Sequence, residues 1–306
     1  MASLRDIKRR IGSVKNTRQI TKAMKLVAGA KLRRAQERAE NAKPYSETLA
    51  QVLQRVCAKA GDEIEHPLLT SHDSVEIVMV VLVGSDRGLC GSFNGALFRK
   101  TRLFVKAQED IGRKVVVRTF GKKARNECAK RYDVLGSEVG LDKTNYVEHS
   151  TNLANVLAGD YAAGHFHECY LASNEFVSVM TQRPTFRHIL PMGTPDPGSE
   201  LIPEELQELI KGLGQTEALG QDIDYEYEPG PIELLDTLLP LQLQTILIQS
   251  LFESEAGEHA SRMKAMDSAT RNASDLIDSL TLVYNRARQA AITKELIEIV
   301  SGAEAL

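Results

Sequence analysis

The fold is decided by the stretch MDSATRNASDLIDSLTLVYNRARQA, residues 266–290, which contains neither proline nor glycine. Its apolar and small side chains recur at alternating intervals of three and four residues, the spacing that one side of a paired α-helix shows. At about 1.5 Å per residue, a helix spanning residues 231–306 is on the order of 100 Å long. A globular domain built from the rest of this 306-residue chain cannot bury such a helix along its whole length. The helix must therefore pair with another helix. The predicted seam comprises Met266, Ala269, Ala273, Leu276, Leu280, Val283, Ala287 and Ala290.

The N-terminal segment, residues 1–60, is the expected partner helix. Leu4, Ile7 and Ile11 form a narrow apolar stripe behind a possible N-cap at Ser3. No proline precedes Pro44, and we expect the helix to bend there and continue to about residue 57. A short domain between the two helices makes them antiparallel. The sequence therefore predicts a two-helix antiparallel coiled coil formed by the two ends of the chain.

The middle of the chain has a different pattern, in which β-branched apolar runs alternate with helical ones. Residues 75–83 form a continuously apolar run typical of a strand covered on both faces. Further strands are expected at 115–120, 167–179 and 185–191, with helices at 94–108, 122–130 and 153–166. This alternation predicts an open, mostly parallel, Rossmann-like α/β domain over residues 72–195. Residues 196–230 are acidic and rich in proline and glycine, and we expect a surface excursion there, with one short helix near 206–213.

The sequence offers no positive case for catalysis, a cofactor or a metal. The glycine-rich turn at residues 84–91 follows a strand, where a phosphate could bind, but it matches neither dinucleotide-binding nor P-loop spacing. His165 and His167 are a close histidine pair, yet no pattern of further ligands completes a zinc site. The four cysteines are widely separated and are expected to be reduced. The chain has no run of about 18 apolar residues that would span a membrane.

The basic character of the first helix leaves three interpretations open. Residues 1–43 contain thirteen Lys and Arg residues against three acidic ones, although the whole chain has a net charge of −3. The basic side chains could form the solvent-exposed face of a coiled coil, bind an acidic protein, or bind nucleic acid or an anionic membrane. Alanines rather than aromatic residues separate the charges, which weakens the case for single-stranded nucleic acid.

Three long motifs carry a resemblance to a known family. IGSVKNTRQITKAMKLVAGAK at 11–31, SDRGLCGSFN at 85–94, and RMKAM at 262–266 with YNRARQAAITKELIEIVSG at 284–302 occur in order. Together they resemble the signatures of the gamma subunit of F-type ATP synthases, bacterial type, over essentially the whole chain. The resemblance implies a non-catalytic rotor shaft that couples proton flow to ATP synthesis, or ATP hydrolysis to pumping.

The resemblance also implies partners, location and contact residues. The expected partners are three alpha and three beta subunits, the epsilon subunit and the membrane c-ring, with no nucleic acid. The expected location is peripheral, on the cytoplasmic side of a bacterial plasma membrane. Matching motif positions imply contacts between rotor and stator at Met24, Lys25, Arg262, Gln289 and Thr293.

Two features of the sequence differ from known members of the family. The acidic stretch at 195–222 is longer than is usual in bacterial members, and we expect a surface loop. The closely spaced cysteine pair of chloroplast members is absent, which argues against a thiol switch.

Two alternative functions remain for the chain. A coiled-coil protein that binds DNA or membranes would show salt-dependent binding to them without other proteins. A nucleotide-binding enzyme would require a phosphate loop.

Overall fold

The computed structural model describes residues 3–60, 66–140, 144–192, 210–211, 228 and 230–304. The chain divides into two compact units. One unit joins residues 1–30 to 262–306, and the other comprises residues 31–261. Both long helices continue through the two units, so the units do not coincide with the four segments expected from the sequence. Whether those segments are separate domains stays a prediction.

The first helix, α1, runs from Leu4 to Ala60 and ends close to the expected position. Ser3 caps it, because the Ser3 hydroxyl accepts a bond from the Asp6 amide at 3.2 Å and lies 2.8 Å from the Asp6 carboxylate. This arrangement satisfies a backbone donor that the first helical turn leaves unpaired. Pro44 lies inside the helix without ending it.

The sheet has the strand order β3-β2-β1-β4-β5-β6. The first four strands are parallel neighbours, β5 is antiparallel to β4, and β6 is parallel to β5. The expected strands are all present, and β3 and β6 are strands that the sequence analysis did not predict. The strands are β1 (Ile77–Val83), β2 (Lys114–Phe120), β3 (Asp133–Glu138), β4 (Glu168–Phe176), β5 (Gln182–Leu190) and β6 (Ile210–Lys211).

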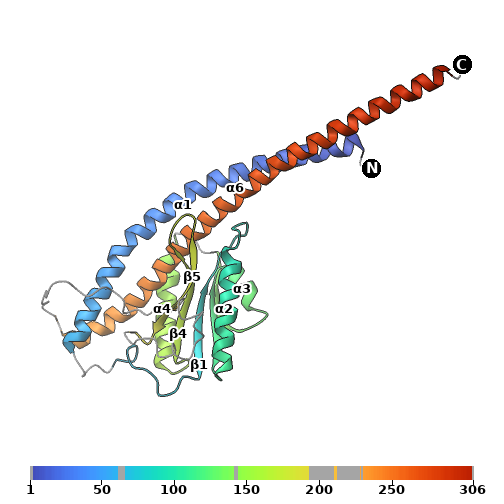
Figure 1. Cartoon of the computed structure of the whole chain (residues 1–306). Coiled ribbons are helices and arrows are strands. Elements are labelled where there is room, and N and C mark those ends of the chain that lie inside the picture. The colour runs from blue at the N-terminus through green and yellow to red at the C-terminus, as the bar shows by residue number, and fades with distance from the viewer. Residues whose placement is uncertain are drawn as a thin grey trace. The chain divides into compact units, whose positions relative to one another are not determined.

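Helices cover both faces of this sheet, with α2 on one side and α4 on the other (Figure 1). The alternation of side chains along β1 explains why its apolar run is continuous. Met79 and Val81 belong to a buried cluster that includes Leu157 of α4, whereas Val78 and Val80 belong to a second buried cluster that contains side chains of α2. Both faces of the central strand are therefore withdrawn from water. The covering helices are α2 (Phe93–Asp110), α3 (Lys122–Cys128) and α4 (Tyr146–Ala162).

The last helix, α6, runs from Pro231 to Glu304. Within the unit of residues 31–261, its side chains Leu235, Leu239 and Leu243 are buried in the same cluster as α4. By length and composition alone, part of α6 is apolar enough to cross a membrane, with a mean hydropathy of 1.2. Burial against a sheet explains this composition in its first half, as it does for other core helices.

The acidic excursion lies mostly outside the described residues. Ile210 and Lys211 are described, and they pair with Phe186 and Arg187 as the edge strand β6. These two residues are thus extended rather than helical, which corrects the expected short helix at that point. Pairing with β5 explains the difference, since the sheet supplies backbone partners that an isolated turn of helix lacks.

Candidate interaction surface

Helices α1 and α6 run antiparallel in the unit of residues 1–30 and 262–306. Lys25 contacts Asp267, and Thr21, four residues earlier in α1, contacts Thr270. Residue numbers therefore fall along α1 as they rise along α6. A Cβ placed on Gly29 would lie 3.4 Å from the sulfur of Met263, in ordinary van der Waals contact. The antiparallel pairing expected from the sequence is present in this unit.

The predicted seam residues differ in how far they are buried. Ile7 and Met266 are buried, and Leu4, Ile11, Leu280 and Ala287 are half-buried. Leu276 and Val283 are 41% and 47% exposed in the chain by itself. The residue following Leu276, Ile277, is 6% exposed and occupies the buried side there. The set as a whole remains a prediction about the coil seam.

The five predicted stator contacts differ in accessibility. Gln289 and Thr293 are exposed and one turn apart, and the Thr293 hydroxyl donates to the Gln289 carbonyl at 3.0 Å. Met24 and Lys25 are half-buried, and Lys25 is engaged by Asp267. Arg262 is 8% exposed. The two residues on the last turns of α6 are therefore the most open to a partner.

The C-terminal part of α6 extends beyond the N-terminal end of α1 (Figure 1). The contacts of Lys25 and Thr21 place the first turn of α1 opposite residues near 288 of α6. Beyond that level, large apolar side chains are exposed on a helix without a second helix beside it. Such an apolar surface is a candidate site for interaction with another protein. These side chains are Ile292, Leu296, Ile297, Ile299 and Val300, which are 49–67% exposed.

The turn after β1 is a compact hydrogen-bonded structure. The Asn94 side chain accepts from the Ser85 amide at 3.0 Å and donates to the Ser85 hydroxyl at 2.7 Å. The same Asn94 amide lies 3.3 Å from the Cys90 sulfur. Leu89 has a φ of +62° and is 63% exposed. A leucine in this left-handed conformation is unusual, and with its apolar side chain in solvent it marks this turn as a second candidate contact surface.

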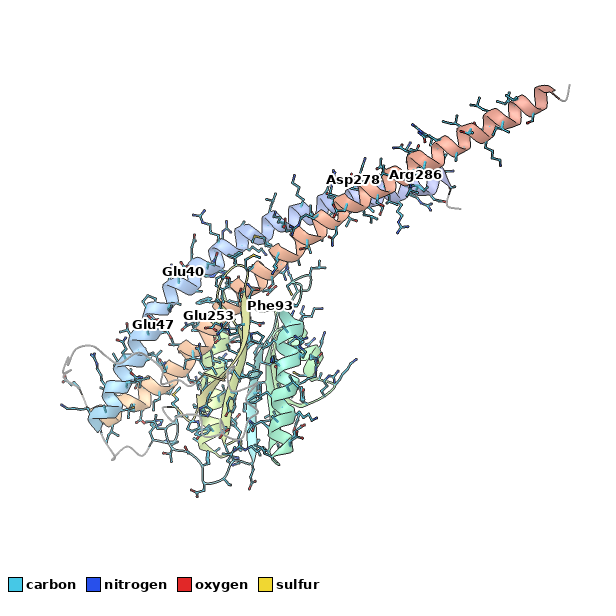
Figure 2. The ribbon with its side chains drawn as sticks, viewed as in Figure 1. Glu40, Glu47, Phe93, Glu253, Asp278 and Arg286 are labelled. Carbon is cyan, nitrogen blue, oxygen red and sulfur yellow. The ribbon has the colours of Figure 1, made fainter. Side chains whose placement is uncertain are left out.

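The same turn leads into a contact between α2 and α6. Phe93 begins α2 at its end near α6 (Figure 2). A Cβ on Gly257 of α6 would lie 3.1 Å from the Phe93 ring and 3.2 Å from Gln182, so the missing side chain makes room for both. Gln182 in turn accepts a 2.7 Å hydrogen bond from Ser261. The turn, the β4–β5 hairpin and α6 are thus held together in the unit of residues 31–261.

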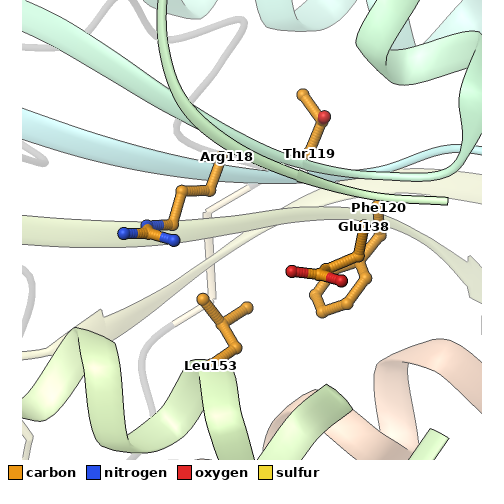
Figure 3. Close-up of a pocket in the computed structure, with 6 residues that line it drawn as sticks. Arg118, Thr119, Phe120, Glu138 and Leu153 are labelled. Carbon is orange, nitrogen blue, oxygen red and sulfur yellow. The ribbon is translucent and has the colours of Figure 1, made fainter. Parts of the chain in front are cut away.

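Two cavities among the described residues differ greatly in size. One, between β2, β3 and α4, has a volume of about 10 Å³ and is lined by Arg118, Phe120 and Leu153 among others (Figure 3). That is room for about one water molecule. A more open hollow of about 410 Å³ is lined by Thr70, His72 and Tyr161 among others.

No group of three or more potential metal ligands gathers among the described residues. The ring nitrogens of His165 and His167 contact different partners. His165 pairs with Asp160 at 3.2 Å, whereas the His167 ring accepts the Ile77 amide at 3.1 Å. The backbone bond fixes the His167 ring to β1, which is a structural role.

The cysteines are free thiols in the described structure. Cys90, Cys128 and Cys169 are buried, and Cys57 is half-buried. Burial raises the pKa of Cys128 to about 12 and also raises the pKa of Cys57 and Cys169, because the charged thiolate loses its hydration. At neutral pH these three side chains are thiols of low reactivity.

Comparison with solved structures defines the class of fold. A chain from the central stalk and c-ring of the Tetrahymena thermophila mitochondrial ATP synthase aligns with a TM-score of 0.59 and 21% identity, covering 82% of this chain and 99% of that one. A chain from the Euglena gracilis mitochondrial ATP synthase, in its OSCP/F1/c-ring assembly, aligns with a TM-score of 0.60 and 18% identity, covering 99% and 94%. The chain, with its long terminal helices and inserted sheet, therefore shares the fold of these two chains.

Sequence comparison identifies the family. The profile of the family described as ATP synthase matches residues 3–306. The ATP synthase gamma chains of Desulforamulus reducens and of an Anaeromyxobacter species are 42% and 43% identical to this chain, and each alignment covers the whole of both chains. The chain belongs to the family of bacterial ATP synthase gamma chains, and it is a non-catalytic subunit.

Proposed function

We propose that this chain is the central rotor shaft of an F-type ATP synthase, turning inside a ring of three alpha and three beta subunits. The observation that carries the proposal is the pair of antiparallel terminal helices whose C-terminal end is an exposed apolar helix. Two paired helices resist bending and twisting more than one helix does, which a shaft under torque requires. Rotation then couples proton flow through the membrane sector to ATP synthesis on the beta subunits, or ATP hydrolysis to pumping.

The partners follow from the two candidate surfaces and from the family. The exposed apolar side chains at 292–300 suit a collar formed by alpha and beta subunits around the end of the shaft. The sheet domain binds the epsilon subunit and the c-ring. The chain then lies peripheral to the membrane, on the cytoplasmic side of a bacterial plasma membrane, as the bacterial relatives suggest.

Reconstitution tests this function directly. The purified chain is mixed with alpha and beta subunits from the same organism, and the 3:3:1 complex and its magnesium-dependent ATPase activity are measured. We expect activity to appear with this chain and single-molecule rotation to follow from it. Omission of the chain is the control. Failure of competent alpha and beta subunits to form a complex with the folded chain would contradict the shaft function.

The contact residues are tested in the reconstituted enzyme. We propose that Arg262 and Gln289 touch the stator together with Met24 and Thr293, and that Lys25 acts within the coil as argued below. The double variant Arg262→Gln/Gln289→Ala should lower coupled ATP synthesis at least about 5-fold. That factor corresponds to a loss of about 1 kcal/mol of binding free energy at an interface.

The control is the double variant Arg286→Gln/Asn285→Ala, which makes the same kinds of change at exposed positions of the same helix. Because Arg262 is buried in the chain, melting curves of both double variants are compared first. Unchanged synthesis and torque in a well-folded Arg262→Gln/Gln289→Ala enzyme would remove these residues from the contact surface.

A further inference from the structure

Four polar side chains interrupt the apolar seam between α1 and α6, and we call them the polar layer: Thr21, Lys25, Asp267 and Thr270. The hydroxyls of Thr21 and Thr270 lie 2.8 Å apart, and Thr21 is only 8% exposed. Lys25 Nζ donates to one carboxylate oxygen of Asp267 at 2.5 Å. The other oxygen of Asp267 accepts from Arg271 at 3.2 Å, so the carboxylate is held from both helices.

Apart from the polar layer and Arg262, the buried side chains of this unit are apolar and do not choose one alignment. Ala28, Met266, Ala273 and Ile277 are buried, and none carries a polar atom that needs a particular partner. Apolar side chains that repeat every seven residues fit again when one helix slides by seven residues along the other. In coiled coils, a single buried polar contact selects one register among such alternatives.

Only the observed alignment satisfies both contacts of the polar layer. A slide of seven residues in one direction would bring Asp267 opposite Arg18, but Thr270 would then face Val14. In the opposite direction both polar side chains would face apolar ones, which are Leu32 and Ala28. Asp267 would keep only Arg271 of its own helix, and the Lys25–Asp267 and Thr21–Thr270 contacts would be lost, which disfavours that alignment.

We propose that the polar layer is a register lock that prevents the two helices of the shaft from sliding along each other. Lys25 and Asp267 are then positioning residues, and Lys25 acts inside the coil rather than on the stator. A slide of one heptad would move surface groups on α1 by about 10 Å relative to those on α6, at about 1.5 Å per residue. The consequence for torque rests on the proposed function, while the lock itself is a property of this chain.

The lock should determine register more than stability. The Lys25–Asp267 pair is half-exposed, with 42% and 34% of the two side chains accessible, and exposed pairs contribute little to the free energy of folding. Valine in place of threonine makes the seam more apolar. Substitutions that remove the lock should therefore leave the melting temperature nearly unchanged while they admit a second alignment.

Electron-spin distance measurement on the full-length chain tests this directly. Spin labels are placed on α1 by Gln19→Cys and on α6 by Arg288→Cys, both of which are exposed positions. Cys57 is replaced by alanine, and the three buried cysteines remain. The unlocked variant carries Thr21→Val, Thr270→Val and Asp267→Asn. The control carries the same kinds of change at exposed positions of the same helices, Thr17→Val, Thr281→Val and Asp278→Asn.

The parent and the control should each show one distance, and the unlocked variant should add a second one displaced by about 10 Å. The original distance alone in a helical unlocked variant would overturn the lock, as would a lowered melting temperature with an unchanged distance. If the unlocked variant loses its helical circular dichroism, the three single variants decide. A second distance in any of them supports the lock, and its absence from all three overturns it.

Discussion

One close backbone approach in the sheet domain depends on a glycine just after β2. Gly121 has a φ of +89°, and a Cβ built there would meet the Gly84 carbonyl oxygen. Its amide donates to the Glu138 carbonyl at 2.7 Å, so it joins the ends of β2 and β3. The lack of a side chain at Gly121 thus allows the turn after β1 to pack against the turn after β2.

Substitution of this residue separates crowding from backbone strain. Gly121→Ala should destabilise the chain by about 3 kcal/mol, through a positive φ and a forced movement of backbone. Gly112→Ala is the control, because Gly112 also has a positive φ, of +84°, but has open space around its Cβ position. It should cost about 1 kcal/mol. Equal losses in denaturant unfolding would contradict the crowding at Gly121.

The carboxylate in the coil gives a prediction in pH. Hydrogen bonding from Lys25 holds the pKa of Asp267 below its ordinary value, because it favours the charged form. Any stability from this contact is present above the unfolded pKa of Asp and is lost as pH falls through the lowered folded pKa. Carboxyl-carbon NMR should show the Asp267 pKa rising in Lys25→Gln and unchanged in Lys22→Gln, an exposed neighbour. No rise in the first variant would contradict the contact.

At the scale of the element, β1 shows how a sheet buried on both faces is stabilised. Val80 and Val81 are both fully buried, although they point to opposite faces. Each loses contacts in a dense core when it is shortened, and neighbouring side chains cannot fully close the gap.

Alanine substitutions test this two-sided burial. Val80→Ala and Val81→Ala should each lower the free energy of unfolding by about 2 kcal/mol. Val177→Ala, at a half-exposed position after β4, should change it by less than about 0.5 kcal/mol. A loss at only one of the two β1 positions would show that one face of the sheet is open.

At the scale of the whole molecule, the two units differ in how much they bury. Among the described residues of the unit 1–30 and 262–306, seven side chains are buried, whereas the unit 31–261 contains two large apolar clusters. Local opening is easiest where few apolar contacts hold a segment. We therefore expect the paired helices of the unit 1–30 and 262–306 to be the more dynamic part of the molecule.

Hydrogen exchange provides the test. In the isolated chain, amides of 4–30 and 262–304 should exchange faster than those of β1 and β2. Binding of alpha and beta subunits should slow exchange in these helices at least about 10-fold, because partners that bind only the folded form stabilise it. The amides of β1 are the internal control. Protection that appears in β1 instead would place the partner on the sheet domain.

Several features were predictable because they depend on local spacing. The heptad pattern from Met266 onward indicated a long paired helix, and the apolar run around Val80 indicated a central strand. β3 was not predictable, since only Val134 and Leu135 of Asp133–Glu138 are apolar and the segment contains Gly136. It is a strand because β2 offers it an edge, and Gly136 leaves room there for the Arg118 side chain.

The candidate contact residues came from motif resemblance, and the structure adds what spacing cannot express. The sequence cannot choose between Leu276 and Ile277 for the seam, because both fit intervals of three and four residues. It also could not show that Lys25 is engaged by Asp267, a residue 242 positions away.

The sequence by itself determined the period of the long helices, the positions of β1, β2, β4 and β5 and of the helices between them, and the family to which the chain belongs. These follow from short-range spacing and from motifs that need no partner. Only the tertiary structure decided the register of α1 on α6, the pairing of β3 and β6, and the contact of Phe93 with Gly257. Each of these joins residues far apart in the chain, and its free energy exists only once the two surfaces have met.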